Sequence, residues 1–244
     1  MQDPTSTAPT AAESLYDPRA LQILSTEHWG LLSNRALAYN ESFTRAGMFL
    51  TFLSMSFVAL ALLAQAIGFT GDYMVVAGIA LSFNLLIGLF TFARIITTWI
   101  IDGQSTQGMN RIRQGYVRIA PAVAEYFITG LHDDEAGVNV TYGIRDTSTR
   151  LAGVTYGLST TLGMVGVIVA LLAGLLTGLV AVAGGASLAL SLGVGALAAV
   201  LMFLVQLGWA ARVLIRAALP ARFPTPASTS VVGGEGLEPP TSSV

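Results

Sequence analysis

The sequence predicts an all-α integral membrane protein with four transmembrane helices arranged as two hairpins. Hydrophobic residues make up 53% of the 244 positions and charged residues only 11%, against roughly 25% charged in a typical soluble domain. Long stretches also lack any charge: 26 residues between Arg45 and Asp72, 21 between Asp72 and Arg94, and 61 between Arg150 and Arg212. Because about 20 apolar residues cross a bilayer, each of the first two stretches holds one span.

The third stretch is too long for a single span. As one helix it would be roughly 90 Å long, about three times the thickness of the hydrocarbon layer. We expect it to fold back at Gly184-Gly185, because glycine tolerates turn dihedrals. The first two spans are expected to turn at Gly68–Asp72. The predicted transmembrane hairpins are therefore residues 46–101 and 151–219.

The basic residues predict the orientation. All 12 are arginine, and none lies in either predicted hairpin turn. Positively charged residues favour the cytoplasmic side, so both termini and the central loop are expected there, in a multi-pass protein of the plasma membrane. The first 20 residues are polar and lack the apolar core of a signal peptide, so the first span is expected to direct insertion.

An amphipathic cytoplasmic helix is predicted for residues 17–45. Asp17-Pro18 is a typical helix start, with a capping carboxylate followed by proline in the first turn. Mostly apolar residues then recur at helical spacing: Leu21, Leu24, His28, Leu31, Leu32, Arg35, Tyr39 and Phe43. Such a helix lies on the membrane surface or packs on another cytoplasmic helix. The lack of a lysine-rich polar face favours packing.

The central segment, residues 102–150, is predicted to be a cytoplasmic helical loop. Six residues repeat every three or four positions: Met109, Ile112, Tyr116, Ile119, Val123 and Phe127. Pro121 should kink or restart this helix. Together with the helix of residues 17–45, it is expected to form a small cytoplasmic bundle.

Both ends of the chain have the composition of disordered segments. Residues 1–16 and 220–244 are rich in Ser, Thr, Pro and Gly. The stretch 234–242 also resembles the peptide that results when a transfer-RNA gene is translated, in which case this tail has no function.

Small residues are repeated in the second hairpin. Gly166, Gly174 and Gly178 are spaced by multiples of four in the third span, and Gly153 and Gly157 precede them at the same interval; Gly195 lies in the fourth span. Small residues at this spacing let helix backbones approach closely. They indicate either packing between the third and fourth spans or a subunit contact in an oligomer.

The first hairpin contains the candidate pore or pocket residues Ser54, Gln65, Asn84 and Arg94. An amide in hydrocarbon needs a partner, so Asn84 should either bond between helices or line a pore. Arg94 should extend its side chain to the interface or bind an anion there. No Asp, Glu or His lies inside a span, which argues against a proton-coupled pump.

Few other motifs suggest chemistry. The chain has no cysteine and a net charge of −2, so it offers no thiolate site and no electrostatic attraction for nucleic acid. His132-Asp133-Asp134-Glu135 is either a set of metal ligands or, as we favour, a solvated acidic loop or helix start. No nucleophile elbow, phosphate-binding loop or dinucleotide fingerprint occurs, and we expect no enzyme activity, cofactor or metal.

Several segments resemble a family of uncharacterised membrane proteins from high-GC Actinobacteria. The first runs from Glu27–Trp29 through Asn40-Glu41 into Arg45–Thr51. The second is Met109–Arg111 with Tyr116, and the third is His132–Gly137. The resemblance covers roughly residues 18–150, and it implies no particular activity.

The sequence leaves two classes of function open. One is an oligomeric channel-like protein, with Ser54 and Asn84 in a polar lining and Arg94 at its inner mouth. The other is a non-conducting scaffold or sensor that acts through its cytoplasmic helices. In both, the expected partners are the lipid bilayer and further copies of the chain in a homo-oligomer.

Overall fold

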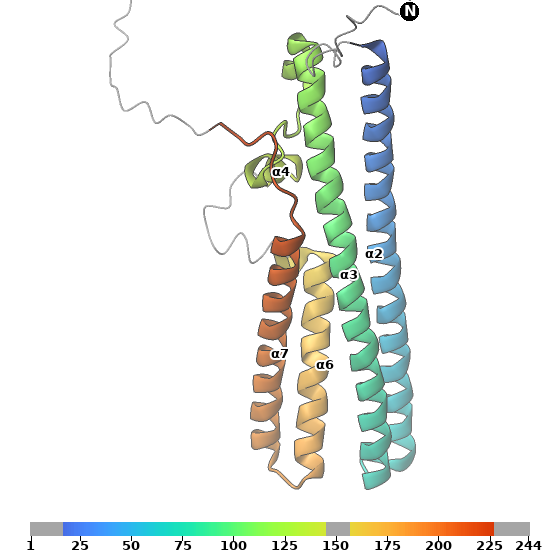
Figure 1. Ribbon diagram of the computed structural model, residues 1–244. Helices are drawn as coiled ribbons and strands as arrows, with labels where there is room; N and C mark the ends of the chain where they lie inside the picture. The colour runs from blue at the N-terminus through green and yellow to red at the C-terminus, as the bar shows by residue number, and fades with distance from the viewer. Residues whose placement is uncertain (1–16, 145–156, 227–244) are drawn as a thin grey trace, which may run out of the picture.

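The computed structural model describes residues 17–144 and 157–226, and within these ranges the regular structure is entirely helical. Two long helices, α2 (Pro18–Ile67) and α3 (Gly71–Ile119), lie side by side, and the shorter α6 (Thr161–Ala183) and α7 (Leu188–Ala217) pack next to α3 (Figure 1). A 3₁₀ helix, η1 (Pro121–Tyr126), and the short α4 (Glu135–Thr141) follow α3.

The ends of the helices form where local sequence favours them. Asp17 caps α2 by accepting the N–H of Arg19 at 2.9 Å, with Pro18 in the first turn, which confirms the helix start predicted there. α2 ends at Gly68, whose φ of 69° is a conformation that glycine adopts readily. The predicted turn between α6 and α7 is likewise confirmed, with Gly184 as the C-cap of α6 and Gly185 at φ 83°.

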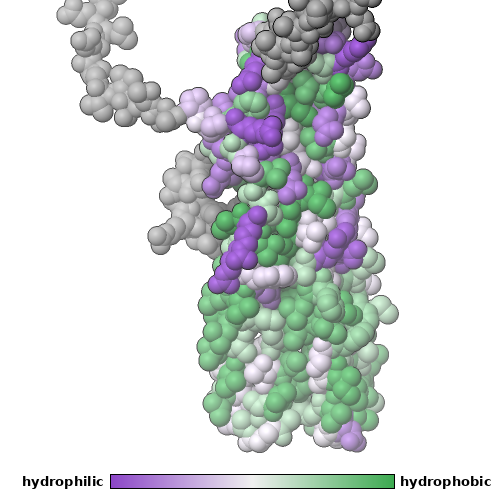
Figure 2. Space-filling view, in the orientation of Figure 1, coloured by the Kyte–Doolittle hydropathy of each residue, from purple (hydrophilic) through white to green (hydrophobic). Residues whose placement is uncertain are grey.

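All four long helices are long and apolar enough to cross a membrane. α6 has 23 residues and spans about 35 Å, whereas the 50 residues of α2 extend over about 75 Å. Hydrocarbon about 30 Å thick would therefore cover most of α6 but less than half of α2. Figure 2 shows the same division: the end of the bundle with the interhelical turns is covered by hydrophobic residues, and hydrophilic residues gather at the other end.

The structure corrects the predicted division of the polar segments into separate helices. From Pro18 on, the predicted helix of residues 17–45 is the first part of α2, and residues 102–119 are the last part of α3. Both helices therefore run without a break from the polar to the apolar end. No proline lies inside either helix after the first turn. As predicted, a new helix starts at Pro121, but it is the 3₁₀ helix η1.

The apolar core lies where α2, α3 and α6 meet. Its buried side chains include Phe49, Phe92, Ile95, Val165, Val169 and Leu172. Gly88 makes this contact possible, because a Cβ at that position would lie 2.7 Å from Cγ2 of Val169 and 3.0 Å from Cζ of Phe49. Each of the other described helices packs against α3, which makes α3 the central element of the fold.

Glycine brings the backbones of α6 and α7 together. A Cβ on Gly174 would lie 2.6 Å from the carbonyl oxygen of Gly195, and one on Gly178 would lie 3.3 Å from that of Ser191. Gly166 instead faces Phe92 of α3 and Gln206 of α7. Gly157 is exposed with open space around it, and Gly153 lies outside the described residues.

Candidate functional site

Asp102 of α3 is the centre of a polar cluster in the part of the bundle beyond the apolar band. It accepts a hydrogen bond from Nε of Arg35 at 2.6 Å and another from the hydroxyl of Tyr142 at 2.6 Å. The Arg35 guanidinium also lies 5.4 Å from the centre of the Tyr142 ring. Burial and the neighbouring Asp102 carboxylate raise the pKa of Tyr142, so its hydroxyl stays protonated and keeps donating. The cluster links α2 and α3 to the segment after α4.

Asp133 is the centre of a second cluster and is 0% exposed. Its carboxylate accepts the backbone N–H groups of Arg222, at 2.9 Å, and Phe223, at 2.7 Å. Nε of Arg111, on α3, donates to the same carboxylate at 2.5 Å. This single side chain therefore holds the segment after α7 against α3.

The environment of Asp133 favours its charged form. Burial by itself would raise the pKa of this carboxyl, but the N–H donors of Arg222 and Phe223 and the Arg111 guanidinium outweigh it and hold the pKa below its usual value. Asp134 behaves in the same way: burial opposes ionisation, and the N–H groups of Gly137 and Thr225 lower the pKa. Both carboxylates are thus charged at neutral pH.

Further hydrogen bonds continue along the C-terminal strap, defined here as the last residue of α7 and the chain that follows it (residues 217–225). Gln104 donates to the carbonyl of Ala217 at 3.0 Å, and Gln107 exchanges two hydrogen bonds with the backbone of Leu219. Asp134 accepts the N–H of Thr225 at 2.7 Å. The strap is therefore bound at intervals along its whole length.

These contacts correct two predictions. Residues 220–226 do not follow the prediction of disorder for 220–244, because they pack on Asp133 and Asp134; residues 227–244, like residues 1–16, lie outside the described part. The acidic segment 132–135 is also not simply a solvated loop. Asp133 is buried, although Asp134 does start a helix as the N-cap of α4. Because both carboxylates already accept several N–H groups, they are poorly placed to bind a metal.

The four candidate pore or pocket residues do not come together. Ser54 is exposed on α2, and its hydroxyl donates to the carbonyl of Leu50 at 2.8 Å. Gln65 is exposed near the end of the same helix, about 16 Å further along it. Arg94 donates to Glu41 at 2.7 Å, and its side chain is 44% exposed. Its charge is already paired, which weakens the case for an anion site.

Asn84 is buried inside the chain. It is 2% exposed, its Nδ2 donates to the carbonyl of Ala80 at 2.8 Å, and its Oδ1 has no partner among the described residues. A side chain enclosed by its own chain is not available to line a pore between subunits. Its hydrogen bond within α3 also does not tie two helices together.

Comparison with known proteins gives no guide to function. The sequence matches no family model, no curated protein and no solved structure. The functional interpretation therefore depends on the arrangement of the side chains.

The two polar clusters are not predictable from the sequence pattern. Arg35 recurs at helical spacing with the apolar residues of its helix, and Asp102 is an isolated acid at the end of an apolar segment, so neither indicates a polar cluster. Their separation of 67 positions hides the contact. One signal was present: Asp102 is the only acidic residue between Asp72 and Glu125.

Replacing Asp133 by Ala should release the C-terminal strap. Each charge-assisted hydrogen bond that is lost contributes about 1.5–3 kcal/mol, so the fraction of molecules with a free strap should rise at least about tenfold. A nitroxide on an Ala221→Cys variant would report this by electron paramagnetic resonance, as a change from a slow to a fast component. Glu135→Ala, an exposed acid nearby, is the matched control and should leave the spectrum slow.

The same label tests the pH dependence. The lowered pKa of Asp133 means that its contribution to strap binding is complete above the usual aspartate value of about 3.9 and is lost as pH falls through the lower folded-state value. The spectrum should therefore be constant between pH 6 and 8. Strap release within that range, or a slow spectrum in Asp133→Ala, would contradict the role of this carboxylate.

Replacing Asn84 by Leu should leave the fold intact and change no ion flux. The substitution removes a buried polar group whose Oδ1 is unpartnered, and membrane hydrogen bonds contribute only about 0.6 kcal/mol on average. Thermal unfolding in detergent and potassium efflux from vesicles are the measurements, with the exposed Ser82→Leu as the control. An efflux in the unmodified protein that Asn84→Leu abolishes would establish the channel instead.

Proposed function

We propose that this chain is a non-conducting membrane scaffold or sensor that acts through the cytoplasmic part of its helices. Its four apolar helices cross the plasma membrane as two hairpins, with the turns outside and both termini in the cytoplasm. The distribution of arginine supports this orientation, because none lies at the hairpin turns. All the basic residues in the described part lie toward the opposite end.

The observation that supports a scaffold is the continuity of α2 and α3. A helix that passes unbroken from hydrocarbon into water holds its polar end at a fixed height and rotation relative to the membrane. Three side-chain contacts fasten α2 to α3 across this boundary: Glu41 with Arg94, Ser42 with Thr98 at 2.5 Å, and Arg35 with Asp102. Such a pair is a stiff support for a binding surface.

A suitable surface lies on the cytoplasmic part of α2. Trp29, Leu32, Ala36 and Phe43, here called the α2 stripe, recur at helical spacing and are exposed; Trp29 is 66% and Phe43 63% exposed. α2 stands off the membrane as an extension of its span, so most of the stripe faces water rather than lipid. Exposed apolar side chains in such a row are typical of a protein-binding surface.

A second copy of the chain is the partner that fits best. The membrane holds every copy in the same orientation, so two stripes meet in parallel with like residues at like heights. The small Ala36 at the centre allows close approach of the two helices. This pairing makes the protein a homo-oligomer whose subunits associate outside the hydrocarbon.

Disulfide cross-linking tests the proposal, because the sequence contains no cysteine. Ala36→Cys should form a covalent dimer when vesicles are oxidised, since a disulfide needs Cβ atoms about 3.5–4.5 Å apart. Asn34→Cys, exposed on the opposite side of α2, is the control and should stay monomeric. Adding Trp29→Ser and Phe43→Ser should abolish the dimer. Absence of a dimer with Ala36→Cys, or equal dimer with both cysteines, would contradict pairing through the stripe.

A further inference from the structure

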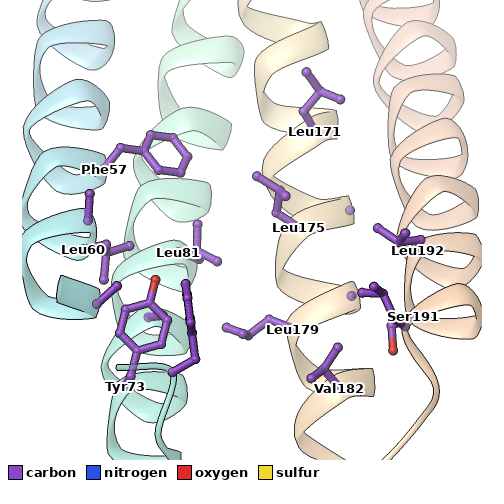
Figure 3. A pocket seen from close by; sticks show the side chains of 18 of the residues that line it. Phe57, Leu60, Tyr73, Leu81, Leu171, Leu175, Leu179, Val182, Ser191 and Leu192 are labelled. Carbon is purple, nitrogen blue, oxygen red and sulfur yellow. The ribbon is translucent and has the colours of Figure 1, made fainter. Parts of the chain in front are cut away.

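A cavity of about 880 Å³ lies between the two helix pairs at the end of the bundle with the turns (Figure 3). Its walls are side chains of α2, α3, α6 and α7, and almost all are apolar. Leu60, Leu81, Leu175, Leu179 and Leu192 are among them. None of the contacts described for the polar clusters or the α2 stripe involves this cavity.

The cavity exists because the helix pairs diverge toward their turns. α3 and α6 are in tight contact at Gly88, where a Cβ would lie 2.7 Å from Val169. Nearer the turns the two helices are further apart: a Cβ on Gly78 would fit without a clash, with its nearest neighbour, Cδ2 of Leu179, 3.9 Å away. α2 makes little contact with α6, so the space opens into a wedge.

The dimensions of the wedge match one leaflet of a bilayer. Its lining on α6 runs from Leu171 to Val182, which is about 16 Å along the helix, and half of the hydrocarbon layer is about 15 Å. A helix of about 10 Å diameter and this length would occupy roughly 1,300 Å³, more than the cavity offers. A hydrocarbon chain is narrow enough to enter.

Polar groups are confined to a few positions on this surface. The Tyr73 hydroxyl points toward Leu60 and Leu81 in Figure 3, and Gln65 also lines the cavity. Ser191 is 2% exposed, and its hydroxyl has no partner within the described part of the chain. The Tyr73 hydroxyl and the Gln65 amide can bond to the ester region of a lipid whose chain fills the apolar part.

We propose that this wedge is a binding site for one acyl chain of a bilayer phospholipid, taken from the leaflet on the side of the hairpin turns. The chain packs between the helix pairs and fills a space that their own side chains leave open. The site goes beyond the scaffold function and does not depend on it, because the wedge is formed within a single chain.

Photocrosslinking in vesicles tests the site. The full chain is reconstituted in phosphatidylethanolamine and phosphatidylglycerol, with a small fraction of phosphatidylglycerol that has a diazirine on one acyl chain. After irradiation, adducts are mapped by mass spectrometry. They should concentrate on the cavity-facing residues Leu175, Leu179 and Leu192, above the level on the outward-facing Leu197 and Leu201.

Filling the cavity should remove these adducts. Ala61→Phe with Ala64→Phe, or Ala196→Phe from the opposite wall, should lower them about tenfold, a change equivalent to 1.4 kcal/mol of binding. Ala59→Phe, on the exposed side of α2 outside the lining, is the control and should leave them unchanged. The two filling variants enter from different helices, so a fold defect in one leaves the other as a test.

Three results would overturn the proposal. Adducts spread evenly over all lipid-facing residues would show ordinary contact with the bilayer. Displacement of the adducts by oleic acid but not by unlabelled phosphatidylglycerol would assign the site to a free fatty acid. A disulfide between two copies of Leu192→Cys would show that a second chain fills the wedge.

Discussion

The structure depends on the unbroken passage of α2 and α3 from an apolar to a polar environment. Inside hydrocarbon every backbone N–H and C=O must bond within its own helix, and both helices continue this pattern well beyond the apolar band. Since each of the other described helices packs on α3, their positions follow from this pair. The α6–α7 pair and the C-terminal strap are then placed by contacts with it.

The two ends of the bundle are stabilised differently. In the apolar part, buried side chains and glycine-mediated approach of the backbones, as at Gly174 and Gly195, hold the helices together. In the polar part, Asp102 and Asp133 each gather several donors from segments far apart in the chain. Removing one partner from such a cluster leaves a buried charge unsatisfied. These two acids therefore have a large influence on the stability of the polar end, although they are only two residues.

Local features of the fold were predictable from sequence, and long-range ones were not. The positions of the spans and turns follow from charge-free stretches and from Gly68 and Gly184-Gly185, all of which act locally. The continuity of α2 is not evident from the sequence, because Arg45 ends the polar segment at the edge of a charge-free stretch, although an arginine does not interrupt a helix. Asp133 was misjudged for a different reason: its partner Arg222 lies 89 positions away, and no local pattern reveals such a contact. For the same reason, composition alone misplaced residues 220–226.

In the proposed orientation, the apolar end of the bundle crosses the membrane with its turns outside and the polar end in the cytoplasm. Labelling of single cysteines with a membrane-impermeant maleimide in intact cells tests it most directly. We expect labelling of Gly71→Cys and Ala183→Cys, both exposed at the turns, and none of Asn34→Cys until the cells are permeabilised. Labelling of Asn34→Cys in intact cells, with both turn positions protected, would contradict it.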